Sequence, residues 1–325
     1  MKAIVYNNYG GIEALQIKEV EKPSPKDNEV LVKVKAVSIN DWDWGKLDGS
    51  SLFNRIFSGL WKPRHQILGS DIAGRIEAIG KNVSRFKVGD EVYGDLSGRW
   101  GGFAEYCCAP EKALALKPAG MNFLEAAAIP QAAMLAVQGL IDKGQIKPGH
   151  KLLINGAGGG VGTFGVQIAK LLGVDVTGVD HTNKLDMMRS VGFDHVIDYT
   201  GEDFTKNGKK YDVILDVKTN RLIFHYLRAL NSGGIYVTVG GSMSRLFQTL
   251  LLLPFISMFS KKKVSIVALK PNKDLAYMNE LFENGKVKAV IDGHFNLEQV
   301  PDAFRLFSKA NHKGKIVISV DDIDT

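Results

Sequence analysis

Cysteine is almost absent from this sequence of 325 residues, and its two cysteines, Cys107 and Cys108, are adjacent. Adjacent cysteines cannot build a zinc ribbon or a disulfide framework, because both need several spaced thiols. The opening residues MKAIVYNNYG are typical of a strand and not of a signal peptide. We therefore expect a reducing, cytoplasmic setting.

Long apolar runs are also missing. The longest, from Leu246 to Phe259, is too short to span a bilayer and contains Pro254. We favour a cleft wall or dimer packing as the role of this segment. A peripheral membrane contact is the alternative, because three lysines, 261 to 263, follow directly.

Charge of one sign does not dominate the sequence. The net charge is +6, and 23% of the residues are charged. The lysines and arginines are scattered and form no stripe with interleaved aromatics, so we expect no nucleic-acid partner.

Glycine, in contrast, is abundant at 35 residues, and it clusters in the segment GHKLLINGAGGGVGTFGVQIAK, residues 149 to 170. An apolar run ends in the glycines and an amphipathic pattern follows, which predicts a strand, a tight turn and a helix. A pyrophosphate can approach the first turn of such a helix, where free N–H groups favour an anion. The predicted cofactor-binding residues of this turn are Gly156, Ala157, Gly159, Gly160, Val161 and Gly162.

The pattern along the chain predicts an α/β protein with two parts. Short strand signals fill the first 120 residues, and strand–helix alternation between Lys151 and Ala268 predicts a doubly wound parallel sheet. We assign residues 1–120 to a β-barrel-like domain that residues 270–325 complete, and residues 121–269 to a dinucleotide-binding domain. Asn122 and Glu125 have the spacing of a capping box at a helix start.

Several further segments occur in a known order. They are 36–43 (AVSINDWD), 68–71 (LGSD), 88–90 (VGD), 101–106 (GGFAEY) and 240–242 (GGS), together with His150, Gln167 and Lys170 around the glycines. With these segments the chain resembles the medium-chain dehydrogenase/reductase superfamily, in its zinc-independent quinone oxidoreductase (zeta-crystallin-like) branch. The resemblance implies a GroES-like β-barrel catalytic domain, a Rossmann domain and a homodimer that pairs through an edge strand near Val264–Leu269.

The resemblance also predicts that no metal is bound. Where zinc alcohol dehydrogenases of the superfamily hold catalytic zinc, this chain has Asn40, Ser70 and Gln131. An amide and a hydroxyl are poor substitutes for thiolate and imidazole ligands. Without zinc, the expected chemistry is hydride transfer from NAD(P)H to a quinone or an α,β-unsaturated carbonyl.

Asn40 is the predicted catalytic residue. By resemblance it lies near the nicotinamide and would donate a hydrogen bond to the developing oxyanion of the substrate. The alternative is an asparagine that caps a turn after a strand. Trp44 and Gln131 are expected beside Asn40 in the substrate cleft, and Asp43 is expected to be structural.

The choice of cofactor depends on the second strand of the nucleotide domain. Asp180 is placed to bind both ribose hydroxyls of NADH and to repel a 2′-phosphate. Thr182, Lys184 and Tyr199 match the 2′-phosphate side of quinone oxidoreductases, and Gly240 and Gly241 are expected beside the nicotinamide ribose. The resemblance favours NADPH, and NADH stays open.

Two other functions remain open from the sequence. One is a zinc-free alcohol dehydrogenase. The other is a nucleotide-binding, membrane-peripheral or regulatory protein with little turnover.

Overall fold

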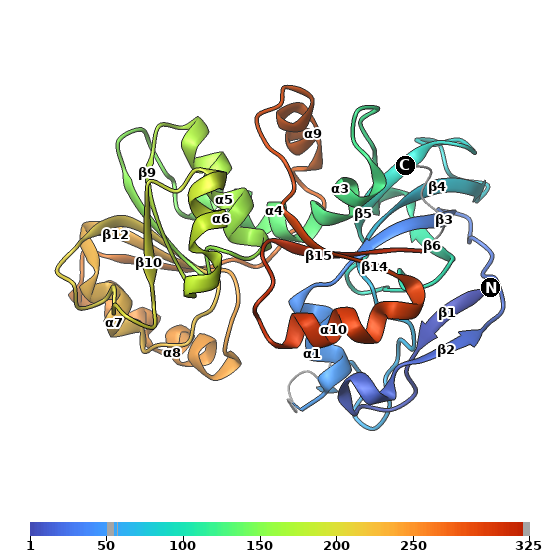
Figure 1. Ribbon diagram of the computed structural model, residues 1–325, viewed down its shortest axis with the longest axis horizontal. Helices are drawn as coiled ribbons and strands as arrows, with labels where there is room; N and C mark the ends of the chain where they lie inside the picture. Colours follow the sequence, from blue (N-terminus) through green and yellow to red (C-terminus); the bar gives the residue numbers. More distant parts are fainter. Residues whose placement is uncertain (51–54, 57, 321–325) are drawn as a thin grey trace. The chain divides into compact units, whose positions relative to one another are not determined.

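The computed structural model describes residues 1–50, 55–56 and 58–320, which form two compact units (Figure 1). Unit 1 comprises 1–131, 271–284 and the segment from 291 onward, and unit 2 comprises 132–270 and 285–290. Residues 121–131 were expected in the nucleotide domain. The structure groups these residues with unit 1, because helix α3 (Phe123–Ala128) packs against four of its strands. The predicted capping box is confirmed: Asn122 Oδ1 accepts from Glu125 N at 2.8 Å.

Unit 1 is organised around one long strand, β3 (Glu29–Ser38). It pairs antiparallel with β4 (Asp71–Ile79), β6 (Tyr106–Pro110) and the C-terminal strand β15 (Lys315–Ser319). The other strands of unit 1 are β1 (Lys2–Val5), β2 (Gln16–Glu19), β5 (Glu91–Asp95), β7 (Ala115–Leu116) and β14 (Ile291–Asn296).

The core of unit 1 is apolar and well filled. Val30, Val32 and Val34 alternate inward along β3, as expected for a strand with one buried face. Phe304, on helix α10 (Val300–Ser308), closes the core and meets the Phe103 ring edge-on at 5.7 Å. Two further helices of unit 1 are α1 (Asp41–Asp48) and α9 (Leu275–Glu283), and α4 (Pro130–Val137) begins in it.

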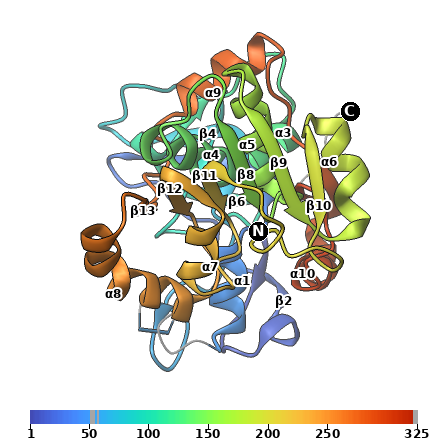
Figure 2. The same ribbon diagram turned by 90° about the vertical axis from the view of Figure 1, so that its left-hand side faces the viewer.

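Unit 2 is a six-stranded parallel sheet in the order β10-β9-β8-β11-β12-β13, seen side by side in Figure 2. This is the doubly wound sheet that the sequence predicts. Its strands are β8 (Lys151–Asn155), β9 (Asp175–Asp180), β10 (His195–Asp198), β11 (Tyr211–Asp216), β12 (Leu230–Thr238) and β13 (Lys263–Ile266).

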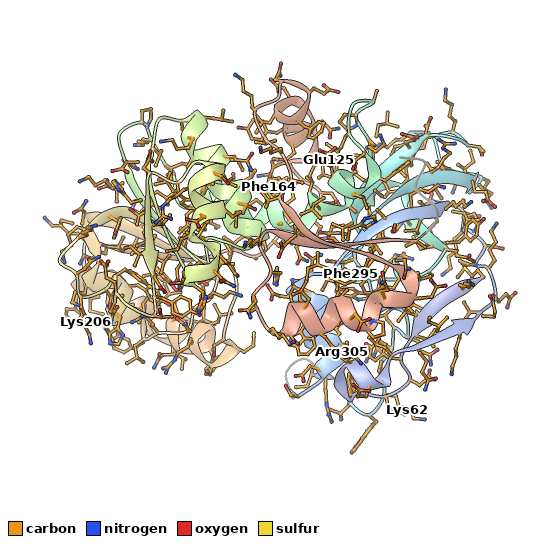
Figure 3. All side chains as sticks on the ribbon, viewed as in Figure 1. Lys62, Glu125, Phe164, Lys206, Phe295 and Arg305 are labelled. Carbon is orange, nitrogen blue, oxygen red and sulfur yellow. The ribbon has the colours of Figure 1, made fainter. Side chains whose placement is uncertain are left out.

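Helices cover both faces of the unit 2 sheet. Leu152 and Ile154 pack on the face of α5 (Gly160–Leu171) and α6 (Leu185–Val191), while Leu153 packs on the opposite face. That opposite face carries α7 (Ile223–Arg228) and α8 (Met243–Phe259). Phe164, labelled in Figure 3, is buried on α5. Burial on both faces explains why these strands have continuous apolar runs.

Candidate active site

The glycine turn of unit 2 joins β8 to α5. The N–H groups of Gly156 and Ala157 both donate to Val179 O, at 3.0 and 3.1 Å, and so tie the turn to β9. A side chain is impossible at Gly162, because a Cβ there would lie 2.2 Å from Ala157 O. The turn therefore has the strand, close turn and helix start that the glycine pattern predicts.

Gly159 is the N-cap residue of α5 and differs from Gly162 in what surrounds it. A Cβ on Gly159 would meet no atom closer than Gly156 O at 3.7 Å, so packing within the chain does not require glycine there. A phosphate that approaches the N–H groups of the first helical turn would require it. The turn thus fits the pyrophosphate of a dinucleotide.

Asp180, at the end of β9, already has partners on both carboxylate oxygens. Gly158 N donates to Oδ2 and His181 N donates to Oδ1, both at 2.8 Å. Lys184 Nζ lies 3.4 Å from Oδ1, and both side chains are buried. Asp180, which was expected to repel a 2′-phosphate, and Lys184, which was expected to bind it, therefore form an ion pair. Its two charges offset each other at the edge of the glycine turn.

The other residues predicted to bind the cofactor lie along the same edge of the unit 2 sheet. Thr182 Oγ1 donates to Asp198 Oδ2, and this bond lowers the pKa of Asp198 below its usual range. Tyr199 is half exposed, with its ring 5.9 Å from that of His181. Gly241 has a φ of 113°, and a Cβ there would lie 2.1 Å from Lys218 O, so the backbone itself requires this glycine.

A buried polar cluster at the carboxyl ends of β8, β11 and β12 was not predicted. Asp216 is fully buried, with its Oδ1 accepting from Asn155 Nδ2 and its Oδ2 accepting from Tyr236 OH, both at 2.7 Å. Gly240, also predicted to bind the cofactor, accepts through its carbonyl from Thr238 Oγ1 at 3.2 Å. These bonds fix the edge of the sheet where ligands bind in doubly wound folds.

In unit 1, Asn40 occupies the short link between β3 and α1, as the N-cap residue of that helix. Its side chain is held by two partners: Nδ2 donates to Ser70 Oγ at 3.3 Å, and Oδ1 accepts from Lys315 Nζ at 2.5 Å. An ammonium can only donate, so the amide oxygen must face Lys315. The amide NH2 then has a fixed direction: it donates to Ser70, and it also interacts with the Asp71 carboxyl, whose pKa it lowers.

Asp43 fixes the backbone around Asn40 through hydrogen bonds. It is fully buried and accepts from Asn40 N at 3.0 Å and from Gly69 N at 2.9 Å. These bonds tie the first turn of α1 to the segment that carries Ser70. Burial raises the pKa of Asp43 to about 7, although both backbone bonds act in the opposite direction.

Lys315 and Asp71 form an ion pair within this cluster. Lys315 Nζ also donates to Ile39 O at 3.0 Å and lies 3.9 Å from Asp71 Oδ2. Burial raises the pKa of Asp71, the neighbouring carboxyl of Asp95 raises it further, and the Lys315 ammonium opposes both. Burial likewise lowers the pKa of Lys315, against the attraction of Asp71 and Asp43. The cluster therefore keeps protons on carboxyl groups at pH values where exposed aspartates have lost them.

Gln131 and Trp44, the other two predicted cleft residues, have different surroundings. The backbone N–H of Gln131 donates to Asp71 Oδ2 at 3.1 Å, so Gln131 joins the Asn40 cluster. Trp44 is half-buried against the core, with its ring centroid 6.4 Å from that of Phe304.

The residues at the zinc-ligand positions do not fit zinc. Asn40 and Ser70 bond to each other, and a lysine ammonium contacts the amide oxygen that a metal would need. Over residues 1–50, 55–56 and 58–320, no group of three or more His, Cys, Asp or Glu side chains is arranged to hold a metal ion. We therefore derive no step through zinc.

Comparison with known proteins agrees with the two-part fold. Residues 26–119 match the alcohol dehydrogenase GroES-like domain family, and residues 191–318 match the family described as zinc-binding dehydrogenase. The chain is 32% identical to the NADPH-dependent alkenal/one oxidoreductase, chloroplastic, of Arabidopsis thaliana, over 98% of this chain and 79% of that protein.

Two further relatives match over nearly their full length. The chloroplast envelope quinone oxidoreductase homolog of Arabidopsis thaliana is 31% identical, over 98% of each chain. The solved structure of the quinone oxidoreductase from Coxiella burnetii superposes with a TM-score of 0.89, at 25% identity over 99% of each chain.

The chain belongs to the medium-chain dehydrogenase/reductase superfamily, in its quinone oxidoreductase-like branch, and it is an oxidoreductase. The resemblance drawn from the sequence is confirmed.

Proposed function

We propose that this enzyme reduces quinones or α,β-unsaturated carbonyl compounds with NAD(P)H and without zinc. The observation that carries the proposal is the Asn40 amide, locked by Lys315 at the position where zinc enzymes of the superfamily have a metal ligand. The names of the relatives, an alkenal/one oxidoreductase and a quinone oxidoreductase homolog, support the substrate class.

Asn40 is the proposed catalytic residue. A reduced nicotinamide dinucleotide bound at the start of α5 would supply the hydride. Addition of hydride to an enone or a quinone places negative charge on the carbonyl oxygen. The Asn40 N–H would donate to that oxygen, and its fixed direction means that no reorganisation is needed as the charge develops.

Lys315 is the proposed positioning residue. Its ammonium holds the amide oxygen of Asn40, so that the NH2 group and not the oxygen is presented to a carbonyl. Its positive charge beside the amide also makes the N–H a stronger donor, because hydrogen bonds polarise one another at low local dielectric.

We further propose NADPH as the preferred cofactor. Lys184 offsets the charge of Asp180, and two backbone N–H groups occupy the carboxylate oxygens that NADH would need. The carboxylate is then less able both to bind ribose hydroxyls and to repel a 2′-phosphate. The name of the Arabidopsis alkenal/one oxidoreductase is consistent with this choice.

A homodimer is the proposed assembly. Strand β13 lies at the end of the unit 2 sheet, and an edge strand offers unpaired backbone groups to a second copy. The cytoplasmic location expected from the sequence stays a prediction; the names of both Arabidopsis relatives place those proteins in the chloroplast.

The test is steady oxidation of NADPH and of NADH by a panel of small quinones, enones and enals, with simple alcohols and NADP⁺ assayed in the reverse direction. Turnover of the quinones or enones supports the proposal. Turnover of alcohols alone would instead indicate an alcohol dehydrogenase, and cofactor binding without turnover would indicate a regulatory protein. Activity should survive a chelator; loss that added zinc restores would refute the metal-free proposal.

A further inference from the structure

Helix α8 of unit 2 presents an apolar face to solvent. Phe255 is 59% exposed, Met258 69% and Phe259 79%. The other large apolar side chains exposed on this helix are Met243, Phe247, Leu250 and Leu251. A contiguous exposed apolar patch on a protein surface commonly marks a site of interaction with a protein, a ligand or a membrane.

The exposed residues form one face and are not scattered. Phe247, Leu251, Phe255 and Phe259 follow one another at four-residue spacing, which places them along one side of a helix. Thr249 and Ile256 are buried against the sheet from the other side. An ordinary surface helix has the reverse pattern, with polar residues outward. The outward apolar face of α8 therefore contributes little to the packed core of unit 2.

The sequence on either side of α8 carries charge of one sign only. Residues 217 to 273 contain nine lysines or arginines and no aspartate or glutamate. Lys261 and Lys263 are exposed directly after Phe259, at the most apolar end of the helix.

Further basic side chains lie beside that end. Lys262 Nζ donates to Leu227 O at 2.6 Å, at the end of α7, and Lys210 donates to the next carbonyl, that of Arg228. The repulsion between these two ammonium groups adds to burial in lowering the pKa of Lys262. Basic charge is thus gathered next to an exposed apolar surface.

We propose that α8 docks this enzyme on the surface of an anionic phospholipid bilayer. The helix lies in the interface with its Phe, Leu and Met side chains among the acyl chains, and Lys261 and Lys263 contact the phosphates. A bilayer supplies apolar depth and negative charge together, as this surface requires. The α8 of a second copy would supply apolar surface but no negative charge for these lysines. Within the described ranges, no helix is long and apolar enough to cross a membrane, so the contact is peripheral.

Docking of this kind does not depend on the proposed reaction, and it is tested without turnover. The full chain is sedimented with vesicles of phosphatidylcholine alone and of phosphatidylcholine with phosphatidylglycerol, at low and high salt. We expect binding to the anionic vesicles that weakens as salt rises. Two variants separate the contributions: Phe255→Ser with Phe259→Ser, and Lys261→Gln with Lys263→Gln.

The apolar variant should lose about tenfold or more in partitioning at every salt concentration. The lysine variant should lose about fivefold for each lysine at low salt and little at high salt. Leu171→Ser on α5 and Lys143→Gln are the matched controls, because both residues are exposed in unit 2 and α5 covers the opposite face of the sheet. Unchanged thermal unfolding checks that each variant is folded.

Three outcomes would overturn the proposal. The wild-type chain could fail to sediment with anionic vesicles. The α8 variants could bind as well as the wild type, or no worse than the controls. The apolar variant could change the mass of the protein in solution without any vesicle binding, which would assign the α8 face to a second copy.

Discussion

Lys315 Nζ lies 2.5 Å from Asn40 Oδ1, although the two residues are 275 positions apart in the sequence. The contact joins the last strand of unit 1 to the end of its longest strand. It gives the Asn40 amide a single orientation, because the ammonium can bond only to the oxygen. A side chain that would otherwise cap a helix is thereby made available as a hydrogen-bond donor.

The donor role of Asn40 is tested by Asn40→Asp, which preserves the shape and keeps an oxygen toward Lys315. The Lys315 ammonium beside this position favours the ionised carboxylate, which cannot donate, so we expect kcat to fall about 10²- to 10³-fold, the usual loss when one oxyanion donor is removed. The dissociation constant of the cofactor should stay unchanged in a fluorescence titration. Asn82→Asp, at an exposed site of unit 1, is the charge control. An unaffected kcat would remove Asn40 from the mechanism.

The stability of the protein should fall as pH rises through the acidic range. Asp43 has a pKa of about 7 in the folded chain against 3.8 ordinarily, so between these values the native state keeps a proton that the unfolded state has lost. The free energy of unfolding then decreases by up to about 1.4 kcal/mol per pH unit from this group, and levels off above about pH 7. The raised pKa of Asp71 acts in the same direction.

Urea unfolding of wild type and of Asp43→Asn across this pH range measures that contribution. The variant should be less stable in acid, because an amide offers one acceptor oxygen where two are used, and its pH slope should be shallower. Asp186→Asn, whose side chain is 99% exposed, should keep the wild-type slope. Identical slopes in wild type and Asp43→Asn would show that Asp43 is ionised in the folded protein.

Gly159→Asp should separate cofactor binding from folding. Aspartate is a favourable N-cap residue, and the space around Gly159 admits a Cβ, so the thermal unfolding temperature should be unchanged or higher. The added carboxylate would face the pyrophosphate and weaken cofactor binding about tenfold or more. Gly201→Asp is the control, because a Cβ there meets no neighbour either. Wild-type cofactor affinity in Gly159→Asp would contradict the assignment of the turn.

Asp180→Ser should move the cofactor preference further toward NADPH. It removes the carboxylate that neutralises Lys184, and one such charge in a partly desolvated site is worth on the order of 1 kcal/mol, or about fivefold in the ratio of kcat/KM values. The measurement is kcat/KM with each cofactor, and Asp186→Ser is the charge control. An unchanged ratio would mean that Asp180 does not face the ribose.

The sequence predicts the parts of this fold that local pattern determines. The strand–helix alternation expected between Lys151 and Ala268 is found in the structure, from β8, which begins at Lys151, to β13, which ends at Ile266. Strand β14 (IDGHFN) was missed, because its short polar and glycine-containing sequence has no clear alternation and it forms by pairing with β15.

The site was harder to predict than the fold. The glycine turn follows from local spacing, whereas the role of Lys315 depends on a contact across most of the chain. Its one local signal was a charged residue at the start of the apolar strand KIVIS, where a buried lysine needs partners. The Asp180–Lys184 pair was missed because family positions assign the two residues opposite roles, while the 3-10 turn Thr182–Lys184 brings them together.

The discontinuity of unit 1 sets an order of assembly on the ribosome. All of unit 2 is synthesised before β15, and β15 pairs with residues 36–38 of β3, which are among the first to emerge. While unit 2 is being made, Asp71 therefore has no Lys315 to pair with. Residues 36–38 of β3 also lack β15 as a neighbouring strand. The capacity to bind cofactor can arise during translation, but the orientation of Asn40 is acquired only once Lys315 has left the exit tunnel.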